Sequence, residues 1–199
     1  MTRGDDAIIE AVRGGQVDEF AGLVDRHSPR VYAMLVRLIG DAQTAEELAQ
    51  ETFVRAYRGL ERFRGDSSFA TWITQIAVHL ARDHVRARQR NRFVSLDAMM
   101  ERDADTLVFA ESRHAYDPLE EISERETVER FEKALEGIPP NYREVFVLHH
   151  LQNMPYEDIA AMTGDSVGSL KVRAHRARKL IKSVMFPAAG HEAPQDIVE

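Results

Sequence analysis

Apolar residues recur at helical spacing through most of this 199-residue chain, and no segment shows the strict alternation that is typical of a β-strand. In residues 43–59, one helix face carries Ala45, Leu48, Ala49, Thr52, Ala56 and Tyr57. A longer helix is expected at about residues 68–90, with an inward stripe of Phe69, Trp72, Ile73, Ile76, Leu80 and Val85. The pattern therefore predicts an all-α fold.

The helical pattern is interrupted between two sets of helices. In the first set, Pro29 either begins a helix or lies in a kinked continuation of residues 17–27, and Gly40 ends that helix. After Arg92 the periodicity decays into an acidic stretch, which we expect to be a linker that a partner orders in part. The second set of helices is expected at about 118–136, 140–151, 156–162 and 166–184. The sequence thus predicts two small helical domains joined by an acidic linker, with the boundaries 1–92, 93–117 (linker), 118–185 and 186–199 (tail).

Charge is unevenly distributed along the chain, whose formal net charge is -7. Residues 95–136 hold thirteen Asp or Glu against five Lys or Arg, and this stretch accounts for the negative total. Residues 82–92 hold five Arg against one acid, and residues 164–182 hold six basic side chains against one acid. Such local basic segments attract the phosphates of nucleic acid, although charge alone leaves open that each is only a solvated helix face.

Several classes of site are disfavoured by what the sequence lacks. The chain has no cysteine, which excludes disulfides, thiolate catalysis and cysteine-ligated zinc. It shows no phosphate-binding glycine loop or nucleophile elbow, so we expect neither an enzyme nor a cofactor. His149 and His150 are adjacent and diverge by about 100° on a helix, so no metal site is predicted. No signal peptide or apolar membrane span is evident, and a cytoplasmic protein is expected.

The segment from Tyr156 to Ile181 has the spacing of a helix-turn-helix. Ala160 allows two helices to cross closely, Gly164 permits a positive φ in the turn, and Ser166 caps the second helix. That helix is expected to bury the stripe Val167, Leu170, Ala174, Ala177, Ile181 and Val184. Its opposite face carries Ser169, Val172, His175, Arg176 and Lys179. The segment therefore predicts a helix that enters the major groove of DNA.

The exposed side chains of this helix suit a base-reading surface. Val172 suits contact with a thymine methyl group, Arg173 or Arg176 suits guanine, and Lys171 or Lys179 suits phosphate. The alternative is that Val172 is an incidental surface residue.

Two long strings extend this interpretation to nearly the whole chain. Residues 45–90, "AEELAQETFVRAYRGLERFRGDSSFATWITQIAVHLARDHVRARQR", resemble conserved region two of the extracytoplasmic-function sigma factors of bacterial RNA polymerase, in the sigma-70 superfamily. Residues 135–179, "LEGIPPNYREVFVLHHLQNMPYEDIAAMTGDSVGSLKVRAHRARK", resemble region four of the same family. The resemblance implies a sigma factor that binds core RNA polymerase and directs promoter-specific initiation.

The resemblance places functional residues on matching positions. It implies polymerase binding by Glu47, Gln50, Glu51, Val54 and Arg55. It implies capture of a minus-ten base and stabilisation of melted DNA by Phe63, Arg64, Gly65, Asp66, Ser67, Ser68, Gln75, His79, Arg82 and Arg86. It implies recognition of the minus-thirty-five element by Ser166, Ser169, Lys171, Val172, Arg173, His175, Arg176 and Lys179. The aromatic residues Phe63, Phe69 and Trp72 have core packing as their alternative.

The sequence departs from the family at His79, where Asn is common, at Asp165, where an apolar residue is usual, and at Pro155, which replaces a capping Ser or Thr. The resemblance also implies an anti-sigma factor, which can hold the protein near the inner membrane, and Val54, Leu107, Val108 and Phe109 are candidate anchors for it.

Two other classes of function stay open: a helix-turn-helix regulator that acts without polymerase, and a helical adaptor that sequesters a protein partner.

Overall fold

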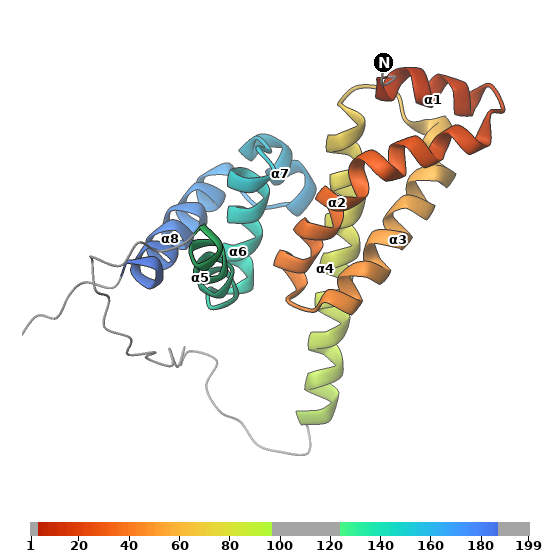
Figure 1. Ribbon diagram of the computed structural model, residues 1–199. Coiled ribbons are helices and arrows are strands. Elements are labelled where there is room, and N and C mark those ends of the chain that lie inside the picture. Colours follow the sequence, from red (N-terminus) through yellow and green to blue (C-terminus); the bar gives the residue numbers. More distant parts are fainter. Residues whose placement is uncertain (1–3, 97–123, 187–199) are drawn as a thin grey trace, which may run out of the picture.

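The computed structural model describes residues 4–96 and 124–186, and within these ranges every regular element is a helix (Figure 1). The predicted all-α fold with two helical domains is confirmed. None of the described helices is long and apolar enough to span a membrane. The linker was predicted at residues 93–117, but the helix that precedes it continues to Leu96. Residues 97–117 of that linker, with the candidate anchors Leu107, Val108 and Phe109, and residues 187–199 of the predicted tail (186–199) lie outside the described residues.

The first domain contains α1 (Asp5–Arg13), α2 (Phe20–Ile39), α3 (Ala42–Gly59) and α4 (Phe69–Leu96), with short 3-10 turns at Val17–Glu19 and Leu60–Arg62. α2 runs through Pro29, so the continuation of residues 17–27 is the correct alternative. Gly40 ends α2 in the left-handed conformation, and the Asp41 carboxylate accepts a 2.8 Å hydrogen bond from the Thr44 backbone N–H at the start of α3. The α2–α3 corner is therefore fixed by local chemistry.

The core of the first domain lies among α2, α3 and α4. Met34, Leu35 and Ile73 are almost fully buried there. The predicted inward face of α3 is correct except at Tyr57, which is 41% exposed, while Phe53 is buried instead. Tyr57 packs edge-on against Phe20 of α2, with ring centroids 5.2 Å apart, because it lies at the rim of the α2–α3 contact.

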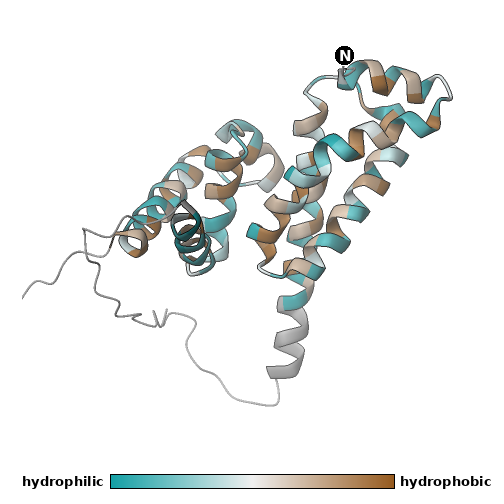
Figure 2. Ribbon diagram, in the orientation of Figure 1, coloured by the Kyte–Doolittle hydropathy of each residue, from teal (hydrophilic) through white to brown (hydrophobic). Residues whose placement is uncertain are grey.

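The second domain contains α5 (Glu124–Glu136), α6 (Pro140–Phe146), a π-helical turn (Val147–Leu151), α7 (Tyr156–Thr163) and α8 (Val167–Met185). Figure 2 shows α5 as largely hydrophilic, and it contributes Ala134 and Leu135 to the core. Along α8 the residues Leu170, Ala174, Ala177 and Ile181 are buried as predicted. Val184 is 45% exposed, so its predicted burial is wrong; Met185, four positions after the buried Ile181, packs on the core instead.

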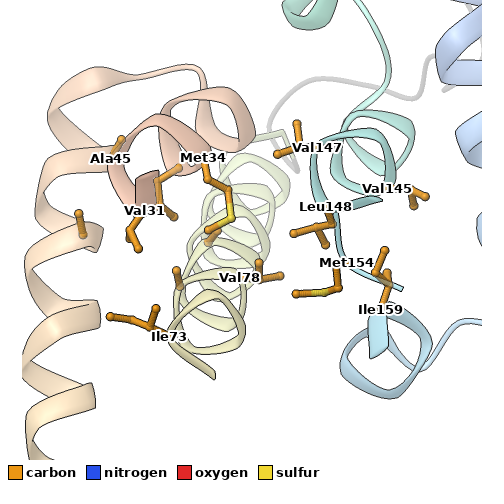
Figure 3. Close-up of a cluster of buried hydrophobic side chains, with 14 of the residues drawn as sticks. Val31, Met34, Ala45, Ile73, Val78, Val145, Val147, Leu148, Met154 and Ile159 are labelled. Carbon is orange, nitrogen blue, oxygen red and sulfur yellow. The ribbon is translucent and has the colours of Figure 1, made fainter. Parts of the chain in front are cut away.

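The two domains pack against each other. α2 contacts α5, α6 and the π-helical turn. In Figure 3, Leu148 and Met154 point from the second domain toward Val78 of α4, and all three are buried. We call this state the closed arrangement.

Polar contacts across the same interface reinforce the closed arrangement. Arg30 donates to the side-chain and backbone oxygens of Gln152 at 2.6 and 2.9 Å, and Arg37 is paired with Glu132 at 2.7 Å. The sequence predicts two domains but contains no signal for this contact between them.

Candidate nucleic-acid interface

The helix-turn-helix is built by α7, α8 and the turn between them. Gly164 has a φ of +78°, which gives the chain its left-handed exit from α7. The Ser166 hydroxyl accepts a 3.2 Å hydrogen bond from the Ser169 backbone N–H, so Ser166 is the N-cap of α8. Ile159 of α7 and Leu170 of α8 are fully buried, which locks the crossing of the two helices. The local geometry that the sequence predicts is therefore present.

One face of α8 points to solvent and is basic. Val172 is 51% exposed, and His175, Arg176 and Lys179 are exposed as well. Ser169 lies one turn earlier and is half-buried. Residues three, four and seven positions apart share one side of a helix, so these five side chains form a continuous stripe, the outward stripe of α8. A hydrophobic group among hydrogen-bond donors matches the mixture of methyl groups and acceptors in the major groove.

Three basic side chains of the predicted set have intramolecular partners: Lys171 and Arg173 outside the stripe, and Arg176 within it. Arg173 donates two hydrogen bonds of 2.9 Å to the two carboxylate oxygens of Asp165. The Lys171 ammonium lies 5.8 Å from the Tyr156 ring centroid, and that ring stacks on His149 at 3.8 Å. Arg176, although exposed, donates a 3.0 Å hydrogen bond to the Tyr142 hydroxyl of α6. The prediction treated Arg173 and Arg176 as equivalent candidates for a guanine contact. In the structure they differ, because Arg173 is paired with a carboxylate in the turn whereas Arg176 lies on the exposed face of α8.

The pKa of Asp165 is lowered, chiefly by the hydrogen bond from Arg173, while partial burial opposes that shift. The carboxylate is therefore held in its charged form within the turn. The Asp165 backbone N–H also donates to the Thr163 hydroxyl at 3.2 Å. Sequence reasoning identified Asp165 as a departure from the family but did not predict the pair with Arg173.

The predicted base-capture loop is exposed. Arg64, Gly65, Asp66, Ser67 and Ser68 all face solvent. Gly65 has a φ of +78°, which sharpens the turn. The Ser68 hydroxyl accepts a 3.1 Å hydrogen bond from the Thr71 backbone N–H, which caps α4. Arg64 and Asp66 form an ion pair of 3.0 Å that leaves 84% and 74% of their side chains exposed.

Phe63, also predicted to contact the minus-ten base, is only 8% exposed. Its ring lies 4.9 Å from the Trp72 ring and 6.2 Å from the Phe69 ring, between centroids. The packing alternative is correct for Phe63, because its aromatic surface is buried beneath the loop. Arg13 of α1 supports the same loop, since its guanidinium donates to the backbone oxygens of Leu60 and Phe63. Nothing in the sequence around Arg13 signals this function.

The predicted stripe on α4 is only partly free. His79 and Arg86 are exposed and Gln75 is half-buried. Arg82 is paired with Glu144 of α6 through a 3.1 Å contact, with 23% and 15% of the two side chains exposed. Burial raises the pKa of Glu144, and the positive charge of Arg82 opposes that shift. Arg82 therefore does not face open solvent as the prediction expected; it lies in the interface between the domains.

The outer face of α3 carries the predicted polymerase-binding residues. Glu47, Gln50, Val54 and Arg55 are exposed, and Arg55 is paired with Glu51 at 2.8 Å. Val54 is 41% exposed. An open groove of about 660 Å³ adjoins this face between α2 and α3, lined by Val24, Ser28, Pro29, Tyr32, Glu46, Ala49, Gln50 and Phe53. The groove was missed because the α2 residues that form one of its walls lie some 20 positions earlier in the chain.

The adjacent histidines 149 and 150 are used in packing. The His149 ring nitrogen Nδ1 is 2.9 Å from the Met154 carbonyl oxygen, and the His150 ring lies 4.9 Å from the Phe146 ring. Burial lowers the pKa of His150, and the neighbouring His149 adds to this effect.

Comparison with known proteins gives matches on both domains. The Sigma-70 region 2 family model matches residues 23–91, and the Sigma-70 region 4 model matches residues 128–181. The chain is 34% identical over 187 residues to the RNA polymerase sigma-H factor of Pseudomonas aeruginosa, covering 92% of this chain and 94% of that protein. It is 31% identical over 183 residues to the ECF RNA polymerase sigma-E factor of Haemophilus influenzae, covering 92% and 96%.

Solved structures share the fold. The sigma factor RpoE in complex with the anti-sigma factor NepR from Bartonella quintana is similar with a TM-score of 0.58 and 22% identity, covering 84% of this chain and 96% of that chain. CnrH in complex with the cytosolic domain of CnrY is similar with a TM-score of 0.57 and 24% identity, covering 91% and 96%.

Proposed function

Because this chain belongs to the extracytoplasmic-function sigma factors of the sigma-70 family, we propose that it binds core RNA polymerase and directs promoter-specific initiation of transcription. The observation that carries the proposal is the basic outward stripe of α8, presented by a capped helix-turn-helix in the domain that matches region four. The protein acts as a recognition subunit, and the polymerase carries out the chemistry.

The second domain reads the minus-thirty-five duplex. α8 enters the major groove with Ser169, Val172 and Arg176 toward the base edges, while His175 and Lys179 lie nearer the phosphates. The Tyr142 hydroxyl limits the motion of the Arg176 guanidinium before DNA is bound. A preordered arginine loses less conformational entropy on binding.

The first domain stabilises the melted minus-ten strand. The loop from Arg64 to Ser68 offers exposed backbone groups, hydroxyls and a carboxylate, which suit hydrogen bonding to the edge of an unstacked base. His79 and Arg86 of α4 follow the strand from there. Phe63 contributes by supporting the loop from below.

The outer face of α3 and the adjoining groove bind protein. The exposed Val54 and Tyr32 provide apolar surface, and polar and charged side chains lie around them. An apolar centre with a polar rim is the usual anatomy of a protein interface. We assign this surface to core polymerase, and to an anti-sigma factor that competes for it. In this account the protein is cytoplasmic, and an anti-sigma factor anchored in the inner membrane can hold it near that membrane.

Promoter binding requires the closed arrangement to open. The minus-ten and minus-thirty-five elements are about 25 base pairs apart, which corresponds to roughly 85 Å of B-DNA. In the closed arrangement, Arg82 of α4 touches Glu144 of α6, and α6 packs directly on α8. The two DNA-binding surfaces must therefore separate before both elements can be bound.

Run-off transcription tests the proposed function. Purified core polymerase is supplied with promoter fragments from the source genome, with and without this protein. We expect promoter-specific transcripts that disappear with Arg176→Glu and persist with Arg125→Glu, a charge reversal of equal size at an exposed site on α5. An absence of transcripts and of a stable complex with core polymerase would contradict the proposal, and tight binding to duplex DNA without polymerase would favour a stand-alone regulator.

A further inference from the structure

The turn of the helix-turn-helix contains a carboxylate that binds the recognition helix itself. Arg173 Nη1 and Nη2 donate to Asp165 Oδ2 and Oδ1, each at 2.9 Å. Two parallel hydrogen bonds between a guanidinium and a carboxylate fix the orientation of the guanidinium plane as well as its position. Arg173 is therefore held toward the turn, back along α8 from its own position.

The pair is shielded from water. Only 24% of the Arg173 side chain and 22% of the Asp165 side chain are exposed. Thr163 further fixes the turn through its hydrogen bond with the Asp165 backbone. An ion pair with this burial and bidentate geometry is more persistent than an exposed pair, where solvent and side-chain entropy compete.

The position of Arg173 on the helix makes the pairing consequential. At about 100° per residue, Arg176 lies about 40° from Val172 around the helix axis, whereas Arg173 lies about 100° away, at the edge of the outward stripe of α8. An arginine side chain at such an edge is long enough to reach a groove when it is free. Asp165 holds it on the other side, near Glu144 of α6, whose carboxylate adds negative charge.

We propose that Asp165 determines promoter specificity by holding Arg173 out of the major groove, so that direct base contacts in the minus-thirty-five element come from Ser169, Val172 and Arg176. This inference rests on the proposed function. Asp165 is a positioning residue, because it acts through Arg173 and not by touching DNA. Its removal releases a guanidinium that can donate two hydrogen bonds to O6 and N7 of a guanine.

The test uses holoenzyme reconstituted from core polymerase and the full chain, with a promoter library randomised across the minus-thirty-five element. Bound DNA is sequenced for the wild type, Asp165→Ala, Arg173→Ala and the double variant. We expect Asp165→Ala to add a guanine preference of about tenfold at one further position, in line with the discrimination of a bidentate arginine–guanine contact. The double variant returns to the wild-type base preferences, because the released arginine is then absent.

Arg173→Ala separates positioning from contact. It leaves Asp165 unpaired near the phosphates, so overall affinity falls, but the base preferences stay those of the wild type. Arg176→Ala is the matched comparison and loses a preference that the wild type has. If Arg173→Ala also erases a base preference, or if Asp165→Ala changes none, the proposal is overturned.

Two controls keep the result interpretable. Circular dichroism and thermal unfolding establish that each variant is folded, and Asp165→Asn, which keeps the size of the side chain, replaces Asp165→Ala if the latter unfolds. A failure of the proposed function has a different signature, since wild-type holoenzyme would then select no sequence from the library.

Discussion

Replacing Arg82 with methionine should shift the protein from the closed arrangement toward separated domains. Methionine keeps much of the apolar stem of the arginine but removes the group that pairs with Glu144 at 3.1 Å. Glu144 then lies in the interface with 15% of its side chain exposed and without its main cationic partner. Once the domains separate, water hydrates the same carboxylate, so the substitution penalises only the closed arrangement.

The size of the effect follows from the burial of the pair. Removing one partner of a fully buried ion pair costs about 3–5 kcal/mol. The side chains of Arg82 and Glu144 are 23% and 15% exposed, so solvent relieves part of that penalty. We therefore expect the substitution to destabilise the closed arrangement by about 2 kcal/mol. A difference of ~2 kcal/mol corresponds to a ratio of open to closed molecules that rises about 30-fold.

Single-molecule energy transfer measures that ratio. The chain has no cysteine, so Asp18→Cys and Ser183→Cys, both at exposed positions, give one dye in each domain. Because burial raises the pKa of Glu144 in the closed arrangement, that arrangement binds more protons than the open one. Lowering the pH through the raised pKa should therefore restore closure in the Arg82→Met variant.

The matched control is Arg125→Met, which removes an ion pair within α5 whose side chains are 88% and 61% exposed. It should leave the ratio unchanged. A change of less than threefold in Arg82→Met, or an equal change in the control, would refute the assignment of this ion pair to domain closure.

Three further outcomes are expected. Ser166→Ala removes the N-cap of α8 and should lower the free energy of unfolding of the second domain by about 1 kcal/mol in denaturant titrations, whereas Ser183→Ala near the helix end should cost less. Phe63→Ala should destabilise the first domain by about 3 kcal/mol in thermal unfolding; unchanged stability together with lost minus-ten binding would instead make Phe63 a base contact. Folding lowers the pKa of Asp165 below its ordinary value of 3.8. The charged carboxylate therefore contributes its full stabilisation above pH 3.8, and this contribution is lost as the pH falls through the lowered pKa. Asp165→Asn should remove this part of the acid dependence of the free energy of unfolding.

Much of the fold could be predicted because its signals are local. Helical periodicity, Gly164 and Ser166 each act within a few residues of their own position, and they define the helix-turn-helix without long-range information. The exposed stripe of α8 follows from the same periodicity. Errors arose at the edges of the buried stripes, where another side chain packs inward: Phe53 and not Tyr57 on α3, and Met185 and not Val184 on α8.

The rest depends on contacts between distant segments. Arg82 and Glu144 are 62 positions apart, and either side chain alone is an ordinary charged residue on a helix. Arg13 reaches the backbone of Phe63 across 50 positions, and no pattern links them. Arg173 and Asp165 are close in sequence, but their pairing depends on the angle between the turn and α8. Sequence reasoning therefore identified the candidate DNA-binding residues but not which of them were already paired.

Footprinting of the reconstituted holoenzyme on a responsive promoter tests the central claim most directly. The account predicts protection of the minus-thirty-five duplex together with permanganate-reactive thymines at the minus-ten element, and it predicts that Arg176→Glu abolishes the protection. Protection without any melted minus-ten thymines, or identical footprints with and without this protein, would contradict the account.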